Sequence, residues 1–131
     1  MNSYTPMVLD HFERPRNSGR YEPAHDVIEG RAGRIDQGVM FVLSARVEAG
    51  RLQSVRFAAY GCPHCLAAGS WLSERLAGST REQLQAWSWQ EAAAALQIPI
   101  EKRGRLLILE DAVRALAEAW RDPPYHNDEV A

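Results

Sequence analysis

The fold is decided by residues 52–69, LQSVRFAAYGCPHCLAAG. Up to Tyr60, apolar and polar side chains alternate, with Val55 and Phe57 on one side of the chain, and this period of two predicts a half-buried strand. After Gly61 the apolar residues recur at intervals of three and four, which predicts one face of a helix. The stretch therefore predicts a strand that passes through a glycine turn directly into a helix.

Further strands and helices lie on either side of this stretch in separate blocks. Residues 39–47 alternate in the same way, and a glycine-containing turn joins them to the strand that ends at Tyr60. Residues 27–32 are typical of a short edge strand. Helical patterns cover residues 5–12, a segment after Thr80, and then residues 91–96 and 106–120. The order of one helix, a sheet and several helices predicts an α+β fold, in which helices cover one face of a small antiparallel sheet.

Composition excludes several classes of protein. The chain has 131 residues, with 15 Lys and Arg against 17 Asp and Glu, and this balance argues against a strongly basic nucleic-acid binder. No apolar run approaches the roughly 18 residues of a membrane span, and residues 1–17 lack the apolar block of a signal peptide, so a cytoplasmic location is expected. The length predicts a single domain over residues 1–121 and a mobile tail over residues 122–131.

The residues with the most reactive chemistry are Cys62-Pro63-His64-Cys65, where the predicted strand ends and the helix begins. Free backbone N–H groups at a helix N-terminus favour an anion, so a thiol placed there ionises more readily and becomes a nucleophile or a metal ligand. Cys62 precedes the first turn and is expected to be the more exposed thiol. Cys65 lies about one turn later and is expected to be partly covered.

Three motifs in this order resemble the U-type iron–sulfur cluster assembly scaffolds, a family that includes the N-terminal domain of the nitrogen-fixation scaffold. Residues 8–19, VLDHFERPRNSG, resemble the family's opening DHYENPRNVG. Tyr60-Gly61-Cys62 follows a strand as in the family, and residues 109–113, LEDAV, resemble its EDAI. The resemblance implies a three-stranded antiparallel sheet and a carrier or scaffold without turnover chemistry of its own. It also implies that sulfur arrives from a cysteine desulfurase, that a [2Fe–2S] cluster is assembled, and that acceptor proteins receive it.

The resemblance implies ligand positions that this chain keeps only in part. The family's first cysteine falls on Asp36, its second on Cys62, and its His-Cys pair on Gly104 and Arg105. A cluster takes about four ligands, mostly thiolates, and a cation at Arg105 opposes metal binding. The resemblance therefore leaves the ordinary cluster-holding mechanism without most of its ligands.

Neighbouring residues supply other donors. Cys62, Cys65, Asp36 and His64 make four, a set whose types suit Zn²⁺ or Fe²⁺. An iron–sulfur cluster or a single iron or zinc ion is accordingly one expectation for these residues. Asp36 read alone is also an ordinary turn residue.

The chain keeps only part of a second motif of the family. Members that work with a dedicated Hsp70-type chaperone carry LPPVK before the His-Cys pair, and the matching stretch here, residues 98–102, keeps only Pro99 and Lys102 of its last four positions. The resemblance thus marks Pro99 and Lys102 as a candidate partner-binding connector. The alternative is a plain link between helices that proline keeps extended.

Two alternatives of other classes stay open. The Cys62–Cys65 dithiol has the sequence found in oxidising thioredoxin-superfamily proteins, so the chain is also a candidate thiol/disulfide or persulfide-handling protein, with Cys62 as the attacking or persulfide-carrying thiol and Cys65 as the resolving one. The predicted helices after Cys65 argue against a whole thioredoxin fold. The second alternative is an interaction module without metal, for which Trp71, Trp87 and Trp89 are candidate contact residues, although such side chains also pack well in a core.

Overall fold

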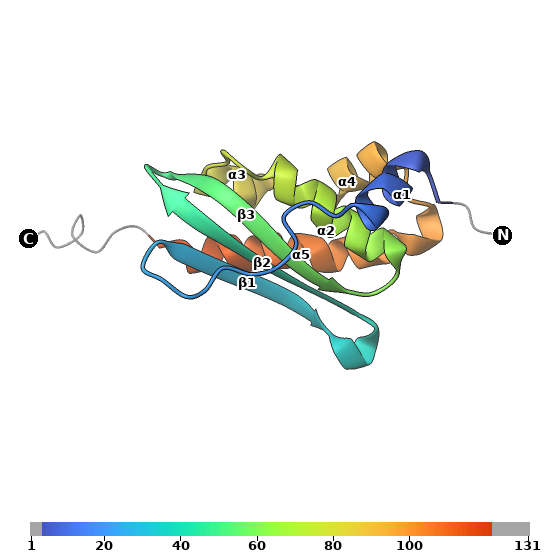
Figure 1. Ribbon diagram of the computed structural model, residues 1–131, viewed down its shortest axis with the longest axis horizontal. Coiled ribbons are helices and arrows are strands. Elements are labelled where there is room, and N and C mark those ends of the chain that lie inside the picture. The colour runs from blue at the N-terminus through green and yellow to red at the C-terminus, as the bar shows by residue number, and fades with distance from the viewer. Residues whose placement is uncertain (1–3, 122–131) are drawn as a thin grey trace, which may run out of the picture.

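The computed structural model describes residues 4–121, and its chain runs from one short helix through a hairpin-built sheet into a set of helices (Figure 1). The elements in chain order are α1 (Pro6–Glu13), β1 (Val27–Arg34), the 3₁₀ helix η1 (Ile35–Gln37), β2 (Val39–Glu48), β3 (Arg51–Tyr60), α2 (Pro63–Arg75), α3 (Arg81–Ala86), α4 (Trp89–Leu96), the 3₁₀ helix η2 (Ile100–Lys102) and α5 (Gly104–Ala119). No helix within residues 4–121 is long and apolar enough to cross a membrane.

The three strands form one antiparallel sheet in the order β1-β2-β3. Helix α5 packs on β1 and β2 while α2 packs on β3, so the core lies between the sheet and the helices. Phe41, Leu43 and Phe57, on β2 and β3, are fully buried in that core. The predicted α+β fold, with helices on one face of a small antiparallel sheet, is confirmed.

The end of β1 differs from the sequence prediction. Strand β1 continues to Arg34 because Gly33 and Arg34 still pair with Met40 and Val39 of β2. The residues between β1 and β2 form η1, which is followed by Gly38 with a positive φ of 90°. The tail predicted for residues 122–131 lies outside the described residues.

The opening motif of the chain fastens α1 to α2. Asp10 of α1 pairs with Arg16, with Nη2 2.8 Å from Oδ2. The Ser70 hydroxyl of α2 lies 2.8 Å from His11 Nδ1 and accepts the backbone N–H of Arg16 at 2.9 Å. The role of these residues is structural, because their polar atoms form the hydrogen bonds and the ion pair that hold the N-terminal segment against α2.

The same segment then borders β3. The backbone N–H of Gly19 donates to the carbonyl of Phe57, and the N–H of Phe57 donates to the carbonyl of Asn17. Phe57 therefore has its backbone occupied by this segment while its ring points into the core.

Two glycines permit the long helices to approach the sheet closely. A Cβ on Gly30 of β1 would lie 2.3 Å from the backbone nitrogen of Leu116 in α5, and a Cβ on Gly69 of α2 would lie 2.5 Å from the ring of Phe57. Neither distance is compatible with a side chain. The spacing of both helix–sheet layers thus depends on the absence of a side chain at these positions.

Gly30→Ala is expected to lower the free energy of unfolding by about 1–3 kcal/mol or more, because the methyl group meets backbone atoms that cannot rotate away. Urea unfolding followed by circular dichroism measures the change. Gly104→Ala, where nothing lies within 4 Å of the added Cβ, is the matched control and should leave stability unchanged or raise it by up to about 1 kcal/mol. Equal stability of the two variants would show that α5 does not approach β1 this closely.

Candidate functional site

Three segments distant in sequence meet at one end of the sheet. They are the β3–α2 turn with Gly61 and Cys62, the loop after η1, and the start of α5. The carbonyl oxygen of Gly38 lies 3.5 Å from the position of a Cβ on Gly61. A shallow hollow of about 210 Å³ joins Gln37–Val39 to Gly104, Arg105 and Ile108. The fold therefore brings Gly104 and Arg105, two of the positions that the family resemblance matches to ligands, beside the loop after η1.

Gly61 makes room for the dithiol. Its φ is +154°, and a Cβ there would lie 2.7 Å from Cys65 Sγ and 2.9 Å from Cys65 Cβ. The turn from strand to helix thus has to be a glycine if the Cys65 thiol is to occupy this place. This requirement is a packing role that the sequence pattern did not reveal.

Cys62 is the N-cap residue of α2 and is partly exposed. Partial burial opposes ionisation, but the dipoles of the Cys65 and His64 backbone N–H groups, the Cys65 thiol and the charge of Arg105 outweigh it, so the pKa of the Cys62 thiol is lowered. The N–H groups act without forming a regular capping hydrogen bond. Cys62 therefore combines access with a stabilised thiolate, as its position at the helix start predicts.

Cys65 lies beneath it and is fully buried. Its Sγ lies 3.9 Å from Cys62 Sγ, within contact distance for two sulfur atoms. Burial, reinforced by the neighbouring Cys62 charge, raises the pKa of the Cys65 thiol to about 12. The pair is therefore an asymmetric dithiol, in which Cys65 keeps its proton at neutral pH and Cys62 is the thiol that ionises more readily.

His64 belongs to the same turn and is only 6% exposed. Its Nδ1 lies 4.0 Å from Cys62 Sγ, and its ring packs on Tyr4 with centroids 4.8 Å apart. Burial, with the positive charges of Lys102 and Arg105, lowers the pKa of His64. The imidazole is therefore neutral at pH 7 and stands beside the thiolate as a polar but uncharged neighbour.

Asp36 does not join this group. Its carboxylate is exposed and pairs with Arg34, with Oδ2 2.8 Å from Nη2. Within residues 4–121, no three His, Cys, Asp or Glu side chains are arranged to hold a metal ion. The expected donor set of Cys62, Cys65, Asp36 and His64 is thus not assembled, and the described residues do not fit a four-ligand cluster.

Arg105 occupies the place where the resemblance puts a cysteine ligand. Its Nε is buried and has no hydrogen-bond partner in the described structure. Its positive charge contributes to the lowered pKa of Cys62 and of His64 and opposes, without cancelling, the rise in the pKa of Cys65. Arg105 was considered from the sequence only as an obstacle to metal, whereas the structure gives it an electrostatic role at the dithiol.

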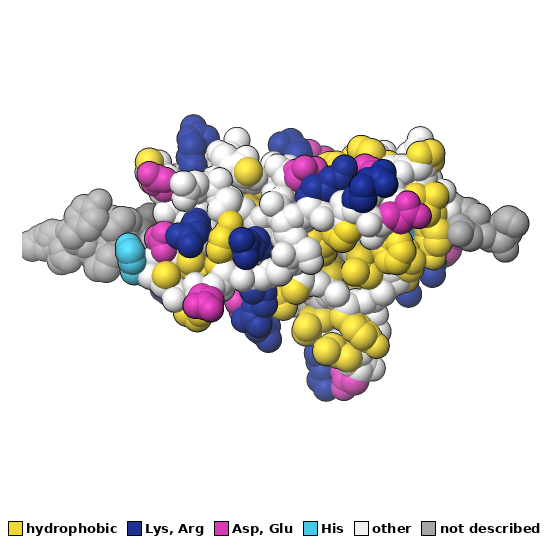
Figure 2. Space-filling view, viewed as in Figure 1, with side chains coloured by type: hydrophobic (Ala, Val, Ile, Leu, Met, Phe, Trp, Pro, Cys, Tyr) yellow, Lys and Arg dark blue, Asp and Glu magenta, His cyan; other side chains and the backbone are white. Residues whose placement is uncertain are grey.

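The connector with Pro99 and Lys102 borders this site through the charge of Lys102 on His64. Pro99 has the extended backbone expected of it, but η2 follows at once from Ile100, which is 77% exposed. Ile35 of η1 and Tyr60 at the end of β3 are also large apolar side chains left about half exposed. Figure 2 shows hydrophobic side chains gathered at the end of the molecule where η1 projects from the sheet. Exposed apolar residues therefore surround the thiol-bearing end.

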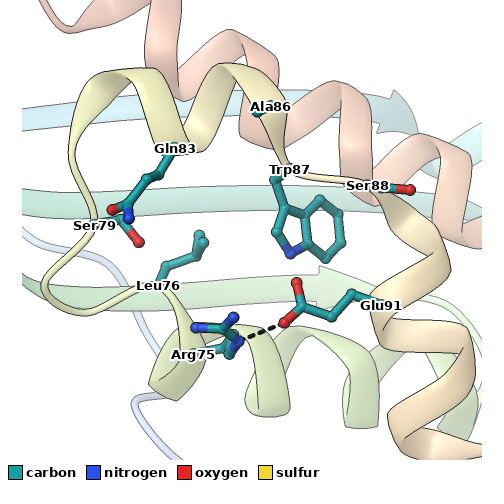
Figure 3. A pocket seen from close by; sticks show the side chains of 8 residues that line it. All are labelled: Arg75, Leu76, Ser79, Gln83, Ala86, Trp87, Ser88 and Glu91. Carbon is teal, nitrogen blue, oxygen red and sulfur yellow. Dashed lines mark hydrogen bonds and ion pairs between the residues drawn. The ribbon is translucent and has the colours of Figure 1, made fainter.

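A second hollow, of about 380 Å³, lies between α3, the start of α4 and the C-terminal end of α2 (Figure 3). Its floor is the indole of Trp87, which is 7% exposed and whose Nε1 has no partner in the described structure. Arg75 and Glu91 form an ion pair at its rim. A helix of 13 residues, about 20 Å long, separates it from Cys62. Trp87 is thus a core residue, and Trp71 and Trp89 also pack partly against the core.

Arg105→Gln is expected to slow alkylation of Cys62 by iodoacetamide several-fold at pH 7. Alkylation follows the thiolate, so the wild-type rate rises with pH and levels off above the lowered pKa of Cys62, and loss of the Arg105 charge moves this curve to higher pH. Mass spectrometry of tryptic peptide 57–75 identifies the modified cysteine. Arg51→Gln, at the far end of β3, removes the same charge and should leave the curve in place; equal displacement in both variants would contradict a local role for Arg105.

The sequence of the chain is similar to those of known proteins. The family model of the NifU-like N-terminal domain matches residues 3–124. The iron–sulfur cluster assembly scaffold protein IscU of Escherichia coli K12 is 30% identical over 115 residues, which cover 86% of this chain and 90% of IscU. The bifunctional protein NifU/MnmA of Rubrobacter xylanophilus is 36% identical over 121 residues, which cover 89% of this chain and 24% of that longer protein.

Solved structures share the fold at low sequence identity. A protein of Fervidobacterium islandicum AW-1, described as an iron–sulfur cluster assembly scaffold for the SUF system, aligns with a TM-score of 0.65 and 15% identity over 87% of this chain and 96% of its own. The N-terminal part of a NifU-like protein from Brucella abortus aligns with a TM-score of 0.55 and 14% identity, over 97% and 95% of the two chains. With the family match and the IscU relative, these similarities show that the chain belongs to the NifU-like N-terminal domain family of U-type iron–sulfur cluster assembly scaffolds.

Proposed function

We propose that this chain serves iron–sulfur cluster assembly as a sulfur acceptor, taking a sulfur atom from a cysteine desulfurase as a persulfide on Cys62. The observation that carries this function is the partly exposed Cys62 thiol with its lowered pKa at the start of α2. A persulfide-accepting thiol has to be reachable by a partner and has to ionise at neutral pH. Cys62 is partly exposed and the pKa of its thiol is lowered, whereas Cys65 is buried and the pKa of its thiol is raised to about 12.

The transfer step is a thiol exchange. The Cys62 thiolate attacks the outer sulfur of the desulfurase persulfide, a new bond forms between Cys62 Sγ and that sulfur, and the desulfurase cysteine leaves as a thiolate with the electron pair of the broken S–S bond. No electrons are gained or lost overall. The positive charge of Arg105 stabilises the attacking thiolate and remains beside the anionic persulfide that forms.

The surroundings of Cys62 support sulfur acceptance over cluster holding on the single chain. The donors that a cluster needs are not assembled among residues 4–121, and Arg105 brings a cation to the site. Iron or zinc binding by Cys62, Cys65, Asp36 and His64 would require Asp36 to leave Arg34 and move toward the thiols. In this function the chain is a carrier of sulfur rather than a catalyst.

Partners are inferred from the same end of the molecule. The exposed side chains of Ile35, Tyr60 and Ile100 offer apolar contact area to a desulfurase or an acceptor protein. Pro99 and Lys102 lie on the connector beside them, where an Hsp70-type chaperone would bind if the reduced motif still serves. The acidic balance of the chain supports protein partners over nucleic acid.

Incubation with a cysteine desulfurase and cysteine is expected to transfer sulfur to Cys62. The readout is sulfur labelled in the cysteine substrate and found on tryptic peptide 57–75 or in released sulfide. Cys62→Ser, which replaces one small side chain by another at the N-cap, should lose the transfer entirely while retaining its circular dichroism spectrum. Undiminished sulfur uptake by Cys62→Ser would rule out Cys62 as the acceptor.

Purification without oxygen separates this function from cluster holding. Because the donors are not assembled, we expect iron and acid-labile sulfide well below one cluster per chain, with no change in Asp36→Ala. Iron and sulfide at a full complement, lost in Cys62→Ser and in Asp36→Ala, would instead show that the predicted four-donor site forms after all.

A further inference from the structure

We propose that Cys65 discharges the Cys62 persulfide within the chain, releasing the carried sulfur as hydrosulfide and leaving a Cys62–Cys65 disulfide. Since this reaction acts on the persulfide of the proposed function, it rests on that function. It adds an activity, because the two electrons that convert sulfane sulfur to sulfide come from this protein's own dithiol.

The first support is distance. Cys65 Sγ lies 3.9 Å from Cys62 Sγ, so a nucleophile is already in contact with the inner sulfur of a persulfide built on Cys62. The contact is maintained by the turn itself, since α2 begins at Pro63 and the carbonyl of Cys62 accepts the backbone N–H of Cys65 at 2.8 Å. Reacting atoms held in contact by the backbone react far faster than the same groups free in solution.

The second support is direction. Attack on a disulfide-type bond is in line, so the outgoing sulfur has to lie on the side of Cys62 Sγ that is opposite Cys65. Cys65 is buried beneath Cys62, whereas Cys62 is partly exposed. In-line discharge therefore requires a desulfurase to deliver the sulfur to the exposed side of Cys62, from which a leaving hydrosulfide can escape.

The reaction balances without an outside oxidant or reductant. Cys65 Sγ forms a bond with Cys62 Sγ, the bond between Cys62 Sγ and the outer sulfur breaks, and its electron pair leaves with the outer sulfur. Cys65 gives up its proton to solvent and the outer sulfur, on the opposite side of Cys62 Sγ, takes one proton from solvent, so a protonated thiol and an anionic persulfide become a disulfide and HS⁻. The two cysteines are oxidised and the sulfane sulfur is reduced to sulfide.

The protonation states of Cys65 and His64 are compatible with this step. Cys65 carries a proton at neutral pH, because burial raises the pKa of its thiol to about 12, and its Sγ lies 3.9 Å from Cys62 Sγ. An outer sulfur cannot leave as S²⁻, so it takes up one proton from solvent as it leaves, which balances the proton that Cys65 loses before it attacks. His64 is neutral and does not compete as an acid. A dithiol reductant then restores both thiols, and each cycle yields one sulfide.

The experiment uses a desulfurase that has been loaded with one persulfide and freed of cysteine. Mixed with the wild-type chain, it is expected to give one sulfide for each sulfur transferred, and tryptic peptide 57–75 lighter by two hydrogen atoms because of the Cys62–Cys65 disulfide. Cys65→Ser is expected to keep the sulfur on Cys62, heavier by one sulfur atom, with a lifetime roughly tenfold or more longer. Dithiothreitol should then release the sulfide from this variant.

Cys65→Ser also separates the two levels of inference. If it takes up no sulfur although it is folded, the proposed function fails. If it holds the persulfide and the wild-type chain holds it equally long, the discharge fails while sulfur acceptance stands. Recovery of the extra sulfur on Cys65 in the wild-type chain would equally overturn the discharge, because it would mean attack on the outer sulfur.

Cys65 is buried, so Cys65→Ala provides a second variant and thermal unfolding checks both. If neither variant folds, the measurement on the wild-type chain still tests the discharge. Release of sulfide without formation of the Cys62–Cys65 disulfide, or a stable persulfide, would contradict it. Glu74→Gln, at an exposed position of the same helix, is the control and should release sulfide at the wild-type rate.

Discussion

The packing of Phe57 against Gly69 is the contact on which the rest of the structure depends. The ring belongs to β3, the glycine belongs to α2, and a Cβ on the glycine would lie 2.5 Å from the ring. Because strand and helix are joined by only Gly61 and Cys62, this contact also sets where the helix begins. The backbone of Phe57, on the edge of the sheet that β3 forms, hydrogen-bonds to the segment that follows α1. Phe57 therefore links α1, β3 and α2. A close-packed layer of this kind transmits position accurately, since it has little room to adjust.

The chemistry of the site follows from that placement. A helix that starts at the end of a strand directs its unpaired N–H groups toward the residue before it, and here that residue is Cys62. The same packing holds Cys65 under Cys62 and brings the start of α5 close enough for Arg105 to act on both thiols. One thiol is thus partly exposed with a lowered pKa, while the other is buried and protonated at neutral pH. The difference comes from where the fold places them and not from their identity.

Much of this could be predicted from the sequence, and the part that could not has physical reasons. The alternation that ends at Tyr60 and the helical spacing after Gly61 are local signals, and both elements are present as predicted. The full length of β1 was missed because Gly33 and Arg34 have no strand pattern of their own and extend the strand only through pairing with β2. The grouping of Asp36 with the thiols was expected from the family resemblance together with residue types, whereas in the structure Arg34, two residues away, pairs with its carboxylate. The effect of Arg105 depends on tertiary contact between α5 and the β3–α2 turn, which no local pattern contains.

Arg105 and Cys65 together change what a scaffold fold can do with sulfur. A cluster-holding site uses its donors to bind iron, and the electrons that reduce persulfide sulfur have to come from elsewhere. In this chain the position that would extend the donor set carries a guanidinium, and a second thiol lies in contact with the first. A guanidinium repels iron but stabilises thiolate, persulfide and hydrosulfide anions alike, so the same substitution that weakens metal binding favours every anionic state along a sulfur-transfer route. The nearby thiol then holds the two electrons that this route needs. The local electrostatics and the sulfur–sulfur contact therefore point to one chemistry, the acceptance of sulfur and its release as sulfide.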